Sequence, residues 1–168
     1  MKQFIKIIKT DAINRKRWDN NESDSDATIR EAFFMIRFRK YYDYVPLVIG
    51  IEGKNKIVME FIDGTDLQDY LLNNPHETDL MYEKVDNIIE LLKEAKIIHG
   101  DLYHLNFIIN ENDLGQNLYL IDFGFARFMG PTESHCDSIG WKNSKDMWMN
   151  PKYDMNMLID PGYDMNNK

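Results

Sequence analysis

Three polar side chains at fixed intervals constrain this chain more than any other feature of its sequence. Asp101 lies in the run His99-Gly-Asp-Leu-Tyr-His-Leu-Asn106, so an amide follows the carboxylate by five residues. A second carboxylate, Asp122, opens the triplet Asp-Phe-Gly directly behind the apolar stretch 118–121. Each residue alone has an ordinary explanation as a turn residue or a strand exit. All three in this order and at these intervals are not explained by chance turns.

This spacing fits the chemistry of phosphoryl transfer. That reaction needs a group that orients the attacking hydroxyl, and oxygen ligands that hold Mg²⁺ beside the phosphates. Asp101 is expected to orient the hydroxyl, and Asn106 and Asp122 are expected to bind the metal. The sequence therefore predicts a phosphotransferase that uses ATP and magnesium.

The flanking sequence predicts elements that would hold the three side chains in place. Residues 79–96 carry apolar side chains at a spacing of about 3.6 residues, which predicts an amphipathic helix. Two short strands, 107–110 and 118–121, are expected between Asn106 and Asp122. The predicted order is helix, loop, strand pair and second carboxylate.

Further elements are predicted from alternation, capping boxes and chain-breaking residues. They are a strand over 2–9, a helix opened by a capping box of Thr28 and Glu31, strands over 47–51 and 56–62, a short helix opened by Thr65 and Gln68, and a helix over 153–159. Between Gly124 and this last helix the pattern predicts mainly loop.

The motif and its setting resemble the eukaryotic-type protein kinase fold over roughly residues 2–160. His99-Gly-Asp stands where ordinary protein kinases have His-Arg-Asp, as in atypical kinases, aminoglycoside phosphotransferases and lipopolysaccharide-core kinases. Ile121-Asp-Phe-Gly124, Ala27-Thr-Ile-Arg-Glu-Ala32 and Val58-Met-Glu-Phe-Ile-Asp-Gly64 are most similar to the small kinase of the KEOPS tRNA-modifying complex. The resemblance implies a reduced two-lobe α+β fold. It would form a single domain over 1–168, with a partial N-lobe and hinge over 1–62 and a partial C-lobe over 63–168.

The resemblance also implies roles for charged residues of the N-lobe. Glu31 would be the helix glutamate that pairs with a strand lysine. Lys6 is the first choice for that lysine and Lys9 the second, and strand parity allows only one of them to face the site. The ordinary alternatives are that Glu31 is the capping partner of Thr28 and that Lys6 is an exposed strand lysine.

Three more positions take roles from the resemblance. The backbone of Glu60-Phe61-Ile62 would be the hinge that holds adenine, with Met59 beside it or simply in the core. Asp154 is expected to brace the backbone of the catalytic loop. With Gly100 in place of arginine, control by a phosphate on the activation loop is expected to be absent.

Relative to the family, the fold is expected to be clipped at both ends. None of the nine glycines forms the glycine-rich loop that covers the phosphates in kinases. Three functions therefore stay open: a serine/threonine kinase of atypical type, a pseudokinase-like module that binds nucleotide or a partner chain, and a small-molecule kinase or ATPase. The exposed sheet edge favours pairing with a protein partner.

The composition and charge of the chain limit its domain count, its cellular compartment and its binding partners. The 168 residues are 43% hydrophobic, which is enough for one domain with a core. No apolar run reaches the ~18 residues of a membrane span, the N-terminus is not typical of a signal peptide, and one cysteine forms no disulfide framework. We therefore expect a cytoplasmic protein without membrane contact. The net charge of −8 argues against direct nucleic-acid binding.

Overall fold

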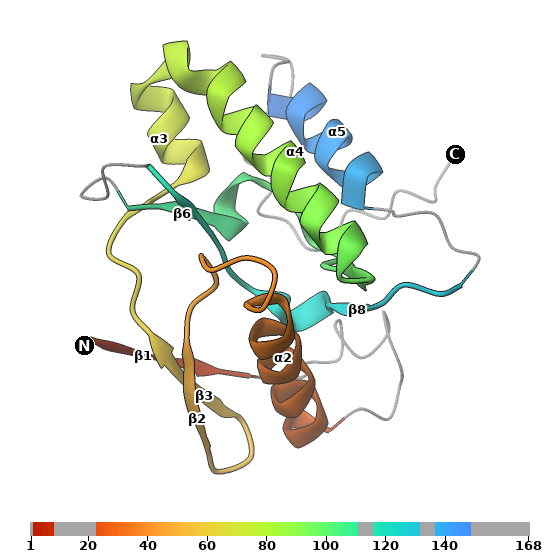
Figure 1. The fold of residues 1–168 in the computed structure, drawn as a ribbon. Coiled ribbons are helices and arrows are strands. Elements are labelled where there is room, and N and C mark those ends of the chain that lie inside the picture. Colours follow the sequence, from red (N-terminus) through yellow and green to blue (C-terminus); the bar gives the residue numbers. More distant parts are fainter. Residues whose placement is uncertain (1, 9–22, 111–115, 132–136, 149–168) are drawn as a thin grey trace, which may run out of the picture.

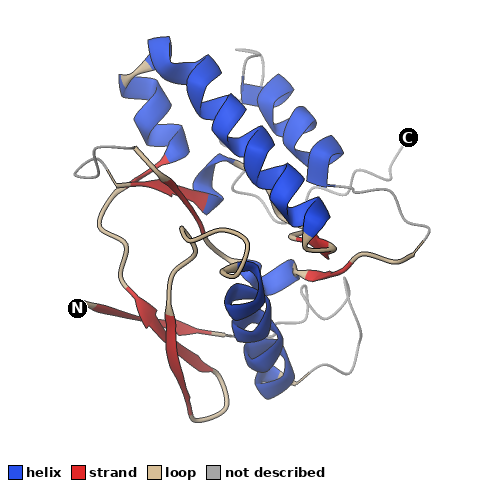
Figure 2. Cartoon of the chain, in the orientation of Figure 1, coloured by secondary structure: helices blue, strands red, loops and turns tan. Residues whose placement is uncertain are grey.

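The computed structural model describes residues 2–8, 23–110, 116–131 and 137–148. Figure 1 shows a three-stranded sheet with one helix beside it, and a group of helices at the opposite end of the molecule. The same view by element type, in Figure 2, shows short strands running between the two parts. This mixture of helices and small antiparallel sheets confirms the predicted reduced α+β fold.

The elements have the following bounds. The strands are β1 Gln3–Ile7, β2 Val48–Glu52, β3 Lys56–Glu60, β4 Thr65–Asp66, β5 Ile97–Ile98, β6 Phe107–Ile109, β7 Leu118–Leu120 and β8 Arg127–Phe128. The α-helices are α2 Asp24–Phe38, α3 Leu67–Asn73, α4 Thr78–Glu94 and α5 Asp137–Trp148. Three short 3-10 helices are η1 Pro75–Glu77, η2 His104–Asn106 and η3 Phe123–Phe125. No helix among the described residues has both the length and the apolar character needed to cross a membrane.

The three-stranded sheet sets the direction of Lys6. Its order is β1-β3-β2, with antiparallel pairing throughout, and Lys6 lies opposite Ile57. Directly paired residues point to the same face of a sheet. Ile57 is fully buried, so Lys6 points toward the interior of the protein. Strand parity thus turns this lysine away from the solvent face that carries Ile5 and Ile7.

The helix α2 begins earlier than the sequence predicts. Ser23 is its N-cap: the Ser23 Oγ accepts from the Asp26 N–H at 3.2 Å, and the Asp26 carboxylate accepts from the Ser23 N–H at 3.4 Å. Thr28 lies inside the helix, where its buried hydroxyl donates to the Asp24 carbonyl at 2.6 Å. The predicted capping box of Thr28 and Glu31 is therefore wrong, and Glu31 is available for other contacts.

A second predicted cap is displaced by one residue. The helix α3 is capped by Asp66, whose carboxylate accepts from the Asp69 N–H at 2.9 Å. Thr65 lies one position earlier and pairs with Ile109 in the strand β4. The predicted box of Thr65 and Gln68 is therefore wrong, although the helix that it was expected to open is present.

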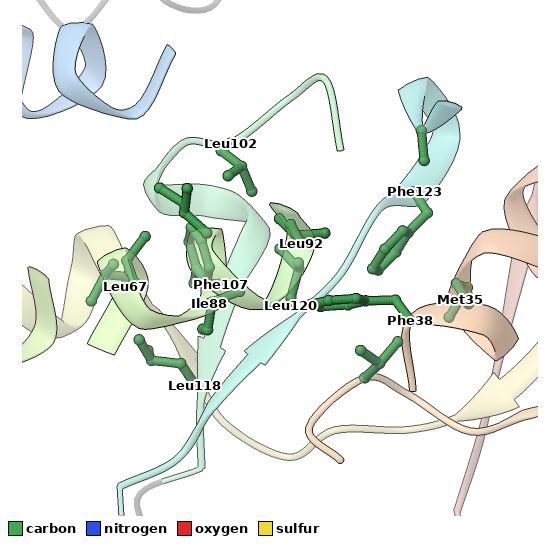
Figure 3. Packing of buried hydrophobic residues seen from close by; sticks show 14 of the residues in the cluster. Met35, Phe38, Leu67, Ile88, Leu92, Leu102, Phe107, Leu118, Leu120 and Phe123 are labelled. Carbon is green, nitrogen blue, oxygen red and sulfur yellow. The ribbon is translucent and has the colours of Figure 1, made fainter. Parts of the chain in front are cut away.

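One apolar core joins the helix α4 to the helix α2. Figure 3 shows Ile88 and Leu92 of α4 beside the β6–β7 pair, with Phe38 of α2 and Phe123 continuing the packing. The elements α2, α4, β6, β7 and η3 all contribute side chains to this core, and these side chains are almost entirely buried. Each such side chain contributes about 1.5–3 kcal/mol relative to an exposed position. The core therefore holds the loop before β6 and the turn after β7 in a fixed relation.

The helix α5 was not predicted. The sequence indicated a loop here because few of its apolar residues fall at helical spacing. Trp141 holds it in place: the indole is 1% exposed and packs against the rings of Tyr82, His104 and Phe107. The helix predicted over 153–159 lies outside the described residues.

Substitution of two glycines tests how closely β4 packs against β6. A Cβ added to Gly64 would meet the carbonyl oxygen of Ile109 and lie 2.9 Å from Cγ2 of Ile108. The pairing of β4 with β6 prevents the backbone from yielding. We therefore expect Gly64→Ala to lower the free energy of unfolding by about 3 kcal/mol. Gly50→Ala is the control, since nothing lies within 4 Å of its added Cβ, and its effect is expected to stay below about 0.5 kcal/mol.

Urea denaturation of the two variants measures this difference. Equal unfolding midpoints for Gly64→Ala and Gly50→Ala would contradict the close contact between β4 and β6.

Candidate active site

Three charged side chains from separate elements meet at one point. The Lys6 Nζ on β1 lies 2.7 Å from Oε1 of Glu31 on α2 and 2.7 Å from Oδ1 of Asp122, which follows β7. The predicted pairing of Lys6 with Glu31 is therefore present, and Lys6 is not a solvated strand lysine. Lys9, the second choice, lies outside the described residues.

The surroundings shift the pKa values of Glu31 and Asp122 in opposite directions. Burial raises the pKa of Glu31 despite the attraction of Lys6, because the side chain is only 2% exposed. Burial also acts against ionisation of Asp122, but Lys6 and the Gly124 N–H outweigh it and lower the pKa of this carboxyl. Burial disfavours the Lys6 ammonium, yet Glu31 and Asp122 outweigh it and raise the lysine pKa. Asp122 is thus held as a carboxylate beside a fixed cation.

The backbone at Asp122 directs its side chain toward the site. Asp122 has φ 62° and ψ 71°, a left-handed conformation that aspartate tolerates better than most residues. Its Oδ1 also accepts from the Gly124 N–H at 3.2 Å. Oδ2 accepts no hydrogen bond from a described residue. This oxygen is on a side chain that is 40% exposed, so it is open to a ligand.

Asn106 is held in an orientation that suits a metal ligand. Its Nδ2 donates to the Asp101 carbonyl at 2.8 Å and to the Asp101 Oδ2 at 3.1 Å. This leaves the Asn106 Oδ1 without a hydrogen bond from the described part of the chain. The Ile121 N–H donates to the Asn106 carbonyl at 3.0 Å, which places Asn106 beside the residue that precedes Asp122.

The free side-chain oxygens of Asp122 and Asn106 suit magnesium better than a metal ion that is coordinated by protein groups alone. No group of three or more His, Cys, Asp or Glu within the described ranges is placed to hold a metal ion. Mg²⁺ commonly takes one or two side-chain oxygens and completes its shell with water and phosphate oxygens. Asp122 and Asn106 would supply such a pair.

A buried aspartate that sequence reasoning missed braces the backbone just before Asp101. Asp137 accepts from the His99 N–H at 2.7 Å and from the Gly100 N–H at 2.9 Å, and it is 3% exposed. The bracing role was expected of Asp154, which lies outside the described residues. Asp137 fills this role, and it was missed because its helix was not predicted.

The backbone at Gly100 leaves no room for a side chain. Its φ is +84°, and an added Cβ would lie 2.7 Å from the carbonyl oxygen of Phe125. The Arg30 side chain donates to the Gly124 carbonyl at 2.9 Å, and Phe128 packs edge-on against Phe33 and Phe34. The segment that follows Asp122 is thus fixed against the loop and against α2. An arginine at position 100 would not fit this arrangement.

Two of the three backbone N–H groups in the predicted hinge Glu60-Phe61-Ile62 already donate hydrogen bonds within the protein. The Glu60 N–H donates to the Leu47 carbonyl at 2.8 Å, and the Phe61 N–H donates to the Lys2 carbonyl at 3.1 Å. The Ile62 N–H donates to no described residue, so it is available to a ligand. Met59 is buried in the core, as its ordinary alternative predicts.

Comparison with known proteins identifies the family. Residues 4–130 match the RIO domain. The chain belongs to the RIO domain family. Asp101, Asn106, Asp122, Lys6 and Glu31 all fall within the matched residues of this domain. The resemblance to atypical kinases is therefore confirmed.

Three curated proteins illustrate what this RIO domain is similar to. The KEOPS complex subunit Bud32 of Pyrococcus abyssi is 38% identical over 130 residues, which are 74% of this chain and 57% of that protein. A probable bifunctional tRNA threonylcarbamoyladenosine biosynthesis protein of Methanosarcina mazei is 35% identical over 98 residues, 58% of this chain and 16% of that protein. The serine/threonine-protein kinase ATG1c of Arabidopsis thaliana is 28% identical over 143 residues, 80% of this chain and 18% of that protein. The chain thus spans less than two thirds of each relative.

Proposed function

We propose that this RIO domain is an ATP- and magnesium-dependent phosphotransferase that acts on serine or threonine hydroxyls of a protein. The observation that carries the proposal is the meeting of Lys6, Glu31 and Asp122 next to the hydrogen-bonded pair Asp101 and Asn106. An ammonium beside an open carboxylate oxygen provides what a nucleotide phosphate and a divalent cation require. The two lobes inferred from the sequence, over 1–62 and 63–168, are part of this proposal.

Each side chain has a task in this reaction. Lys6, held by Glu31, binds the phosphates, and the segment Glu60-Phe61-Ile62 binds adenine. Asn106 and Asp122 hold magnesium, which neutralises charge on the phosphate oxygens. Asp101 orients the acceptor hydroxyl and accepts its proton. The hydroxyl oxygen bonds to the γ-phosphorus while the bond from that phosphorus to the β–γ bridging oxygen breaks, and ADP leaves.

A second candidate, a module that binds a protein partner, is favoured by the surface of α2. Ile29, Phe33 and Ile36 are 55%, 47% and 52% exposed and lie at helical spacing on one side of this helix. Exposed apolar stripes of this kind commonly mark interaction sites. The name of the Pyrococcus abyssi relative describes a subunit of a complex, which supports a partner for this chain as well.

Transfer of the labelled γ-phosphate of ATP tests the proposal. We expect Asp101→Asn to lower the turnover rate by at least about a hundredfold, the usual contribution of a positioned base, while the dissociation constant for ATP and magnesium changes less than about twofold. Label in protein supports the protein kinase, whereas label in a small molecule or in inorganic phosphate supports a metabolite kinase or an ATPase. Nucleotide binding without any transfer by the wild type would favour the partner-binding module.

Transfer by Asp101→Asn at the wild-type rate would contradict the role of Asp101.

A further inference from the structure

The loop between Asp101 and Asn106 buries one ring between two helices. This ring is that of His104, which is 3% exposed, and its Nε2 lies 3.1 Å from the hydroxyl oxygen of Tyr82 on α4, at hydrogen-bonding distance. The same imidazole lies 4.9 Å from the ring of Trp141 on α5, measured between ring centroids. Figure 1 shows α5 beside α4, and the rings of Tyr82 and Trp141 meet edge-on at 5.3 Å. Both helices therefore hold His104.

His104 anchors the short turn that carries Asn106. Both residues belong to η2, a single 3-10 turn, and such turns have poorer hydrogen-bond geometry than α-helices. Leu105, between them, is 42% exposed, and Tyr103 before them is half-buried. Within residues 103–106, His104 is thus the one buried side chain apart from Asn106 itself. The orientation of the turn therefore depends on the contacts of this imidazole.

The orientation of η2 decides which atom the Asn106 amide presents to a ligand. Its Nδ2 donates to the Asp101 carbonyl at 2.8 Å and to the Asp101 Oδ2 at 3.1 Å, so its Oδ1 points away from Asp101. A rotation of the turn would break both hydrogen bonds. Such a rotation would also pull the His104 imidazole away from the Tyr82 hydroxyl, and loss of a partner by a buried polar group is unfavourable. The buried hydrogen bond thus opposes the rotation.

We propose that His104 is a positioning residue, which holds the Asn106 amide through its hydrogen bond to Tyr82 so that Oδ1 is presented to a divalent cation. The role of the cation rests on the proposed function, whereas the orientation of the amide is a property of the protein alone. Groups that orient a metal ligand from behind are important for affinity, and their loss lowers it by about 10–100-fold. The His104 ring packs among α4 and α5, so it acts only through Asn106.

Hydrogen exchange at the Asn106 side-chain amide tests its orientation without any ligand. Exchange with water is followed by NMR, and the amide resonances are those that disappear in Asn106→Asp. We expect exchange to be about tenfold faster in Tyr82→Phe, because this change removes the hydroxyl and retains the ring against Trp141. His104→Leu removes the same hydrogen bond from the side of the loop, and we expect it to have the same effect.

Tyr42→Phe is the matched control for this measurement. The Tyr42 hydroxyl also donates a part-buried hydrogen bond, but to the Leu118 carbonyl on β7, outside the loop. We expect the Asn106 amide of this variant to exchange as in the wild type. Equal acceleration in Tyr42→Phe and Tyr82→Phe would be a general loss of stability, and it would overturn the positioning role of His104. Wild-type exchange in both Tyr82→Phe and His104→Leu would also overturn it.

Calorimetry connects the orientation of the amide to the cation. The ligand is the ATP analogue with a nitrogen between its β- and γ-phosphorus atoms, titrated in magnesium and in excess chelator. We expect the affinity that magnesium adds to fall about tenfold in Tyr82→Phe, while the affinity in chelator matches the wild type. Tyr42→Phe is expected to keep the whole gain from magnesium.

The outcomes separate this inference from the function on which it rests. An equal loss in magnesium and in chelator, or equal gains from magnesium in Tyr82→Phe and Tyr42→Phe, would overturn the proposed action of His104 on the cation. A wild type that gains no affinity from magnesium would overturn the phosphotransferase, whereas faster amide exchange in Tyr82→Phe would still support the positioning of Asn106 by His104.

Discussion

Replacement of Asp122 by asparagine is expected to weaken the binding of ATP in the presence of magnesium by at least about a hundredfold. The change removes the carboxylate that is proposed to bind the metal, and even changes in the groups around metal ligands lower metal affinity by about 10–100-fold. Asparagine tolerates the left-handed backbone at this position, so the fold is expected to be retained. Calorimetry with magnesium and with excess chelator measures the effect.

The control for this variant is Asp86→Asn. The Asp86 carboxylate on α4 is 57% exposed and lies 3.5 Å from the Lys145 ammonium, so its loss removes the same charge from the protein at a distance from the site. We expect its affinity for the nucleotide to match the wild type. A magnesium-dependent affinity of Asp122→Asn equal to that of Asp86→Asn would contradict the assignment of Asp122 as a metal ligand.

Replacement of Asp137 by alanine is expected to have the largest effect on stability. The buried N–H of His99 and the part-buried N–H of Gly100 would both lose a charged acceptor, and hydrogen bonds to charged groups are worth about 1.5–3 kcal/mol each. We therefore expect the free energy of unfolding to fall by about 4 kcal/mol. Guanidinium denaturation measures this loss.

Asp79→Ala is the matched control for Asp137→Ala. Asp79 is also an acidic residue in the first turn of a helix, but it is exposed. Its interaction with the helix dipole is worth less than about 1 kcal/mol. If the two variants lost the same stability, Asp137 would be no more than a helix-end residue and the brace on the catalytic loop would be disproved.

The parts of the fold that could be predicted are those with a local signal. The helix α4 shows its buried face as an apolar periodicity, and it was predicted over 79–96 against an observed Thr78–Glu94. The β6–β7 pair follows from two short apolar runs. In each case neighbouring residues carry the information, so the sequence pattern is sufficient.

The residue at which α2 begins could not be predicted from the local sequence. Both Ser23 and Thr28 are followed three residues later by an acidic side chain, so each has the spacing of a capping box. What decides between them is that the Thr28 hydroxyl is buried and bonded to the preceding turn. That burial depends on the packing of α2 against the rest of the protein, which local sequence does not contain.

The spacing of Asp101, Asn106 and Asp122 indicated a phosphotransferase site. The roles of these three residues remain predictions. The contact of Lys6 with Asp122 was not foreseen, because the two residues are 116 positions apart. The brace by Asp137 was missed because its helix α5 was not predicted, and the loop on which it acts lies 38 positions upstream. Contacts over such separations arise from the assembled fold and leave no spacing to recognise.

The packing of Phe123 has a consequence for inhibitors. This ring has no exposed surface, and it lies 4.7 Å from the His99 ring and 6.0 Å from the Phe38 ring, as Figure 3 shows for Phe38. A compound that binds by displacing the phenylalanine would have to break its packing against the rings of His99 and Phe38. Its observed affinity would be reduced by the small population of that opened state. Under the proposed function, compounds that imitate adenine and leave the ring in place avoid this penalty.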